Sequence, residues 1–147
     1  MNPKFNDLVT RLHEIHDIRK AASVLDWDQH VMMPSKGGAI RAEQLATLER
    51  ISHEKFVSRE MGKLLDELQA YGESQPYDSF EASLIRVTRR DYEKLSRVSP
   101  ELSAEIARTS SISMDAWAEA RRQSDFNMFL PHLEKNVALV HKYVECF

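Results

Sequence analysis

The chain has 147 residues, of which 42% are hydrophobic and 29% are charged, and a formal net charge of −3. This length and composition are typical of one soluble globular domain with its own hydrophobic core, and the acidic balance argues against nucleic-acid or membrane-surface partners. The single cysteine, Cys146, excludes a disulfide framework within the chain, and no window approaches the roughly 18 consecutive apolar residues of a membrane span. We therefore expect a single domain over residues 1–147, and the polar N-terminus without a signal-peptide pattern predicts a cytoplasmic location.

Apolar residues at helical spacing predict the first two helices. In the first helix, apolar residues recur at three- and four-residue steps that only Arg19 interrupts. They are Phe5, Leu8, Leu12, Ile15, Ala22 and Leu25. The segment from Met32 to Gly38 contains Pro34 and two adjacent glycines, so it is predicted to be a loop. A second helix is expected to begin near Ala39, with the inward residues Ala42, Leu45, Leu48 and Ile51.

Capping signals predict the third and fourth helices. Ser58 is placed to cap the third helix and Gly72 to close it, and its inward residues are Met61, Leu64, Leu65 and Leu68. After a polar turn, Asp78 followed three residues later by Glu81 resembles a capping box at the start of the fourth helix. The apolar residues of that helix are Phe80, Leu84, Val87, Tyr92 and Leu95.

Two prolines mark the starts of the fifth and sixth helices. Ser99-Pro100-Glu101 combines an N-cap, a first-turn proline and an acid near the positive end of the helix dipole. Pro131 is expected to open the sixth helix, whose apolar residues are Leu133, Val137, Val140 and Val144. The pattern reaches Phe147 without a stop signal, so an uncovered apolar face is expected to drive self-association. With no convincing strand and no internal repeat, we predict an all-α fold of about six helices in an antiparallel bundle-like array.

The histidines are weak candidates for a metal site. His13 and His16 lie three residues apart, whereas a His-Glu-x-x-His zinc motif needs histidines four apart and a further ligand elsewhere. His53-Glu54 has only the first half of that motif, because Val57 stands where the second histidine is required. We interpret His13 and His16 as solvated surface residues and predict no metal ligand and no catalytic residue in this chain. A small metal-binding enzyme that uses these two histidines is a minor alternative.

Other reactive or charged groups favour structural roles. Asp26 and Asp28 point in different directions on a helix, so they do not form a carboxylate pair, and Asp28 is expected to brace the following chain break. Cys146 lies too near the end of the chain to be held in a shaped pocket. Trp27, Trp117 and the methionines are interpreted as core or packing residues. Five basic residues at helical spacing form a basic stripe: Arg86, Arg89, Arg90, Lys94 and Arg97. This stripe is expected to be a solvated face or to pair with acidic side chains.

Several separate motifs together resemble one known family. The segment from Leu25 to Pro34, followed by Gly37-Gly38 and Arg41-Ala42-Glu43-Gln44, is similar to the N-terminal signature of the thermostable (Taq-type) zinc metallocarboxypeptidases. The stretch from His30 to Met32 departs from that pattern, since the family usually has a smaller polar residue two positions before the methionine. Later stretches fit in the same order, namely His53-Glu54-Lys55, residues 62–65, Pro100-Glu101-Leu102, Ala116-Trp117, Glu119-Ala120-Arg121, Asp125-Phe126, Phe129, Pro131, Leu133 and Glu134. The resemblance spans nearly the whole chain but only roughly the first third of the family.

This resemblance implies a helical fold with a deep groove and an activity that removes single residues from peptide C-termini. In the family, zinc or another divalent metal is held by His-Glu-x-x-His and a downstream glutamate, and the motif's glutamate acts as general base on metal-bound water. None of these ligands can be carried over to this chain. The N-terminal helices help to form the groove wall, and members are often homodimers. The signature residues expected to brace the groove are Trp27, Asp28, Gln29, Met33, Pro34, Arg41, Gln44, Trp117 and Arg121.

The sequence is therefore interpreted as an N-terminal fragment or truncated relative of a metallocarboxypeptidase. It is expected to supply scaffold and groove wall, to bind no cofactor itself, and to be inactive alone. Its expected partner is a second copy of the chain or the missing catalytic half. A stand-alone helical interaction module, which binds a partner through helix-in-groove contacts, is the alternative from a different class.

Overall fold

The computed structural model describes residues 2–147, and the regular structure within this range is entirely helical. Its elements are α1 (Pro3–Val31), η1 (Ser35–Gly37), α2 (Gly38–Phe56), α3 (Arg59–Ser74), α4 (Phe80–Leu95), α5 (Pro100–Gln123), η2 (Phe126–Met128) and α6 (Leu130–Val144). The predicted all-α fold is confirmed. No helix in the described range combines the length and the apolar character that a membrane span requires.

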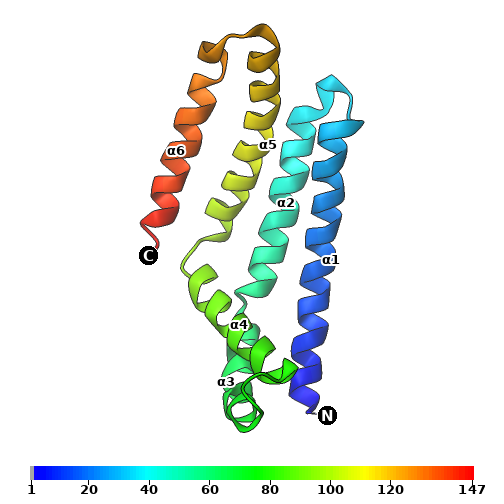
Figure 1. The fold of residues 1–147 in the computed structure, drawn as a ribbon, viewed down its shortest axis with the longest axis vertical. Helices are drawn as coiled ribbons and strands as arrows, with labels where there is room; N and C mark the ends of the chain where they lie inside the picture. Colours follow the sequence, from blue (N-terminus) through cyan, green and yellow to red (C-terminus); the bar gives the residue numbers. More distant parts are fainter. Residues whose placement is uncertain (1) are drawn as a thin grey trace.

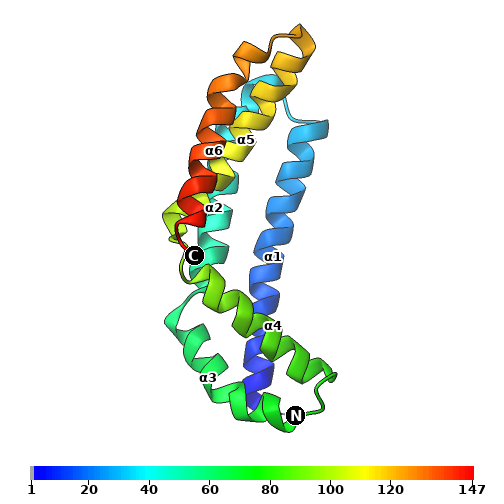
Figure 2. The same ribbon diagram turned by 60° about the vertical axis from the view of Figure 1, so that its left-hand side comes forward.

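The long helices form an antiparallel array (Figure 1). α2 packs against both α1 and α5, and α6 packs against α5. In both views, α3 and α4 form a shorter hairpin at the end of the array where the N-terminus lies, and η2 lies at the opposite end (Figure 2). The predicted antiparallel bundle-like arrangement therefore describes the fold, although the helices spread into a row over much of its length.

Serine caps fix where three of the helices begin. The hydroxyls of Ser58, Ser79 and Ser99 accept hydrogen bonds from backbone N–H groups three residues later, at 3.2, 3.2 and 3.1 Å. The caps predicted at Ser58 and Ser99 are confirmed. Asp78 was the wrong cap for α4, because Ser79 is the residue whose side chain reaches the amide of the first turn.

One other predicted boundary was wrong for a physical reason. Gly72 does not close α3, which continues to Ser74. Instead, α4 approaches α3 closely at this glycine, since a Cβ there would lie 3.3 Å from Cδ1 of Ile85. The predicted break between the first two helices is confirmed: α2 begins at Gly38, next to the predicted start near Ala39, and the 3₁₀ turn η1 lies within the break.

Large apolar side chains form the core at the α3–α4 end. Leu8, Met61, Leu65 and Leu68 are among the most completely buried side chains of the described residues. The same cluster also contains Phe5, Ile15, Phe56, Leu64 and Ile85. Burial of each such side chain contributes about 1.5–3 kcal/mol, so this end supplies most of the hydrophobic stabilisation.

Small side chains pack the rest of the array. The buried residues along α2 and α5 are mostly alanine, serine and threonine: Ala42, Ala46, Ser52, Ala104, Thr109, Ser111, Ser113 and Ala120. The larger residues predicted to face inward from α2, including Leu45 and Leu48, are only half-buried. Trp27 and Trp117 are 60% and 40% exposed, so neither belongs to the core, whereas Trp117 does pack against the Arg121 side chain.

Candidate functional site

Arg41 ties the end of α1 to the start of α2. Its Nη2 lies 2.7 Å from Oδ2 of Asp28, and its Nε donates a hydrogen bond to Oε1 of Gln44 at 3.1 Å. A further hydrogen bond joins Nη1 to the carbonyl oxygen of Leu25. The Arg41 side chain is only 11% exposed, so these partners satisfy its guanidinium where water has little access. The loop between the two helices is therefore held from both sides by one side chain.

Gln29 extends the same arrangement to α5. Its Nε2 donates to the carbonyl oxygen of Ser111 at 3.1 Å and to Oδ1 of Asp115 at 3.0 Å. In return, the Ser111 hydroxyl donates to Oε1 of Gln29 at 2.8 Å. The α2 backbone passes close by, since a Cβ on Gly38 would lie 2.1 Å from Oδ2 of Asp115. The six residues of this signature network are Asp28, Gln29, Arg41, Gln44, Ser111 and Asp115.

Met33 and Pro34 shape the connection between α1 and α2. The carbonyl oxygen of Asp28 accepts hydrogen bonds from the backbone N–H groups of Met32 and Met33, both at 2.9 Å, and these bonds close α1. Pro34 then precedes η1, and the Met33 side chain packs against Gly37, where a Cβ would lie 3.0 Å from Cγ of Met33. Met33 and Pro34 therefore help to set the course of the backbone between α1 and α2.

The remaining signature residues lie outside the network. Trp27 is 60% exposed on α1. The Arg121 guanidinium lies 5.4 Å from the ring centroid of Trp117, which is a cation–π distance. These two residues line a hollow of about 480 Å³ at the η2 end, together with Phe126 and Phe129.

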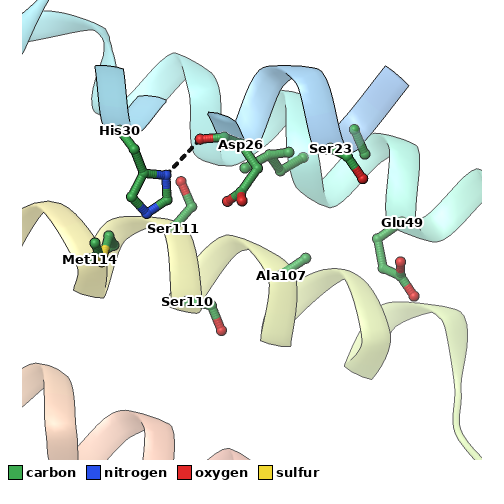
Figure 3. Close-up of a pocket in the computed structure, with 10 residues that line it drawn as sticks. Ser23, Asp26, His30, Glu49, Ala107, Ser110, Ser111 and Met114 are labelled. Atoms are coloured by element: carbon green, nitrogen blue, oxygen red, sulfur yellow. Dashed lines mark hydrogen bonds between the residues drawn. The ribbon is translucent and has the colours of Figure 1, made fainter. Parts of the chain in front are cut away.

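A larger hollow lies between α1, α2 and α5 (Figure 3). It is open to solvent and has a volume of about 530 Å³, and the residues that line it include Asp26 and His30 of α1, Glu49 of α2, and Ser110 and Met114 of α5. The Nδ1 atom of His30 lies 2.7 Å from the carbonyl oxygen of Asp26, drawn as a dashed line in Figure 3. Since a carbonyl oxygen only accepts, Nδ1 is the donor of this hydrogen bond.

The chain is similar to a known family of proteins over nearly its whole length. The model of the carboxypeptidase Taq (M32) metallopeptidases matches residues 7–147. The chain belongs to this family. Thermostable carboxypeptidase 1 of Thermus thermophilus is 29% identical over 141 residues, which are 96% of this chain and 28% of the relative. Its namesake in Pyrococcus furiosus is 28% identical over 144 residues, again 28% of the relative's length.

Solved structures show the same fold. The crystal structure titled BsuCP superimposes with a TM-score of 0.92 at 22% identity, over 99% of this chain and 29% of that chain. The structure of the Pyrococcus furiosus carboxypeptidase superimposes with a TM-score of 0.71 at 28% identity. This M32 chain thus spans less than a third of the length of the relatives and structures that it matches.

The metal that the family name implies has no suitable ligands among the described residues. Within residues 2–147 there is no group of three or more His, Cys, Asp or Glu side chains that could hold a metal ion. A mononuclear catalytic metal needs about three protein ligands. His13 and His16 are both exposed, in line with their interpretation as surface residues, whereas His53 is buried with Nε2 2.8 Å from the carbonyl oxygen of Val98.

The other sequence candidates have structural partners. Arg89 pairs with Asp66 at 2.7 Å, and Arg86 lies 4.1 Å from the ring centroid of Tyr77, so the basic stripe forms intramolecular contacts as expected. Asp28, which was expected to brace the chain break, forms an ion pair with Arg41 on the far side of that break.

Sequence reasoning missed several residues that complete the site. Ser111 and Asp115 join the signature network, and Asp26 and His30 line the larger hollow. The four-residue spacing of Asp26 and His30 places both on one side of α1, which is a usable signal. No local signal marks Ser111, because its partner Gln29 is 82 residues away in the sequence.

Proposed function

We propose that this chain supplies the N-terminal scaffold and groove wall of an M32 metallocarboxypeptidase, a hydrolase that removes amino acids from peptide C-termini. The observation that carries the proposal is the family match over residues 7–147, in a chain that covers 28% of the length of its relatives. The catalytic residues are assigned to the part of the family fold that this chain does not span. The chain alone is accordingly proposed to be inactive.

The proposed role of the signature residues is mechanical. Asp28, Gln29 and Arg41 fasten α1 to α2 and α5 through charge-assisted and amide hydrogen bonds. These three helices line the 530 Å³ hollow, so the network holds its walls at a set separation. A groove that binds peptides must hold its walls in place to keep a substrate in register, and fixed hydrogen bonds on rigid helices serve that purpose.

The metal and the assembly state complete the proposal. We assign zinc or another divalent metal to the complete enzyme, with ligands outside residues 2–147, and no catalytic step to the residues described. The proposed partners are the catalytic part of the fold and a second copy of the protein, in the cytoplasm. Peptides are the proposed substrates of the complete enzyme only.

Complementation tests this function. The purified chain should release no C-terminal amino acid from peptides, with or without added divalent metal. The remaining part of the Thermus thermophilus relative, produced without its own matching N-terminal segment, should gain carboxypeptidase activity when this chain is added. A chelator-sensitive release of amino acids by the pure chain alone would contradict the proposal, and so would an absence of any gain on mixing when the relative's own segment does restore activity.

A further inference from the structure

The outward face of α6 carries apolar side chains at coiled-coil spacing. Five residues follow one another at intervals of three, four, three and four positions, and all are exposed: Leu130, Leu133, Val137, Val140 and Val144. This set is named the α6 seam. Val140 and Val144 are 60% and 61% exposed. Alternating three- and four-residue spacing is the pattern by which one helix packs along another.

The opposite side of α6 is already occupied by α5. Leu139 is buried against it, and the Asn136 Nδ2 donates a hydrogen bond to the Ser113 hydroxyl at 2.7 Å. Lys135 adds an ion pair with Glu105 at 2.8 Å. A rotation of α6 that buried the seam would expose Leu139 and break these contacts. The seam therefore faces outward because of the way α6 is anchored.

A hollow beside the seam enlarges the available surface. It measures about 300 Å³ and lies between α5 and α6, where its lining includes Ile106, Leu139, Val140 and Tyr143. Val140 belongs to both the hollow and the seam. A ridge of valines next to an apolar depression fits the way in which helices pack ridges into grooves.

We infer that the α6 seam is the docking surface for an amphipathic helix from the catalytic part of an M32 carboxypeptidase. This inference rests on the proposed function. The relatives are more than three times as long as this chain, which covers 28% of them, so a folded family member has most of its chain available to cover this face. The BsuCP crystal structure gives the same proportion, since the part that superimposes on this chain, with a TM-score of 0.92, is only 29% of that chain.

A second copy of the chain fits the seam less well. The seam runs only from Leu130 to Val144, which is about two heptads, and sustained coiled coils extend over three or four heptads or more. A pair of α6 helices would thus make a short interface. The partner helix is expected to present its own apolar stripe to Val137 and Val140 and to carry basic residues opposite Glu134, which borders the seam.

A binding experiment with matched lysine variants tests the seam. The probe is the Thermus thermophilus relative without its matching N-terminal segment, in a preparation shown to bind that segment. The chain and its Ala138→Lys variant should bind the probe with the same Kd, because Ala138 is exposed on α6 but off the seam. Val140→Lys should weaken binding at least tenfold, because a charge would be buried in the contact.

Each outcome discriminates between the inference and the proposed function. The thermal midpoint of the isolated Val140→Lys chain should match that of the parent, and Val140→Ala should weaken binding to a smaller extent. Equal binding of the probe by all variants would show that the α6 seam is not the docking surface, and would leave the proposed function intact. An absence of binding by the parent chain would overturn both. A concentration-dependent dimer that Val140→Lys abolishes, without binding of the probe, would assign the seam to a second copy and overturn the inference.

Discussion

Arg41 illustrates how a single residue organises the junction between two helices. It pairs with Asp28 across 13 positions of sequence and reaches back to the carbonyl of Leu25, while Gln44 holds its Nε. A guanidinium can serve these acceptors together because its donors form a rigid planar fork, which the point charge of lysine does not provide. The identity of the residue is thus determined by geometry as well as by charge.

Replacement of Arg41 by Met should destabilise the chain. We expect the free energy of unfolding to fall by about 1.5–3 kcal/mol, since the hydrogen bonds of Arg41 are charge-assisted and its side chain is largely shielded from water. Urea unfolding followed by circular dichroism measures this loss. Arg11→Met is the matched control, because Arg11 makes only a surface pair with Asp7 at 3.1 Å, and a change within about 0.5 kcal/mol is expected. Similar losses for both variants would contradict the bracing role of Arg41.

Gly62 is required by the close approach of α3 and α4. A Cβ at this position would lie 2.4 Å from the Tyr92 hydroxyl and 2.9 Å from Cζ of the same rigid ring. Gly62→Ala should therefore destabilise the chain by about 1–3 kcal/mol through overpacking, even though alanine favours a helix. Gly72→Ala should cost less, since its nearest neighbour is the terminal methyl of Ile85 at 3.3 Å. A stabilised Gly62→Ala variant in urea unfolding would show that the two helices do not meet as described.

At the scale of the helices, one charged cluster links three elements. Arg108 of α5 contacts Glu43 of α2 through two hydrogen bonds of 2.6 and 3.0 Å, and it also contacts Glu105 at 2.6 Å. Lys135 of α6 pairs with Glu105 at 2.8 Å. The hydrogen bond from Arg108 lowers the pKa of Glu43, and hydrogen bonds from Lys135 and Arg108 lower that of Glu105. The carboxylates in turn raise the pKa of Arg108, chiefly through their hydrogen bonds to its guanidinium.

The acid sensitivity of the chain should depend on this cluster. Because both carboxyl pKa values lie below their ordinary value of 4.5, the cluster stabilises the fold above about pH 4.5, and this contribution is lost as the pH falls through the lowered values. Arg108→Met should therefore be less stable than the parent at neutral pH, with a difference that shrinks in acid.

Urea midpoints measured across the acidic range check this expectation. Arg50→Met serves as the control, because Arg50 forms an exposed pair with Glu54 within α2 at 3.0 Å, and its difference from the parent should stay small throughout. A difference for Arg108→Met that is the same at neutral and acid pH would exclude the cluster as the cause.

At the scale of the whole molecule, the stabilising contacts are unevenly distributed. The large apolar side chains gather around α3, whereas α2 and α5 meet through small and polar residues. α6 packs only against α5 and η2 among the element pairs with substantial contact, and its outer face is uncovered. Regions with few buried apolar contacts open at a lower free energy than the rest of a fold.

Hydrogen exchange should reveal this gradient. Amides of α3 are expected to exchange slowest, near the rate set by global unfolding, and those of α6 to exchange much faster through local opening. Mass spectrometry of peptides from residues 59–74 and 130–144 provides the measurement. Equal protection of the two helices in the isolated chain would show that α6 is stabilised by contacts beyond those with α5 and η2.

The local signals in the sequence account for the helices and several of their boundaries. Ser58, Ser99 and Pro100 specify helix starts by chemistry confined to one turn, so they could be interpreted without tertiary information. Gly72 misled the prediction because a glycine can serve close packing as well as helix termination, and only the neighbouring helix distinguishes the two. The site was partly predictable as well, since the motif around Trp27 to Arg41 marked its α1 and α2 residues but not Ser111 and Asp115.

By itself, the sequence determined the all-α class, the N-caps at Ser58 and Ser99 and the membership of the M32 family, because helix signals and family motifs lie in short contiguous stretches. Only the tertiary structure decided that Gln29 meets Ser111, that the tryptophans face outward and that Leu139 is the residue of α6 that becomes buried. Contacts between residues 82 positions apart depend on how helices pack, and an apolar residue at helical spacing does not reveal which neighbour, if any, will cover it.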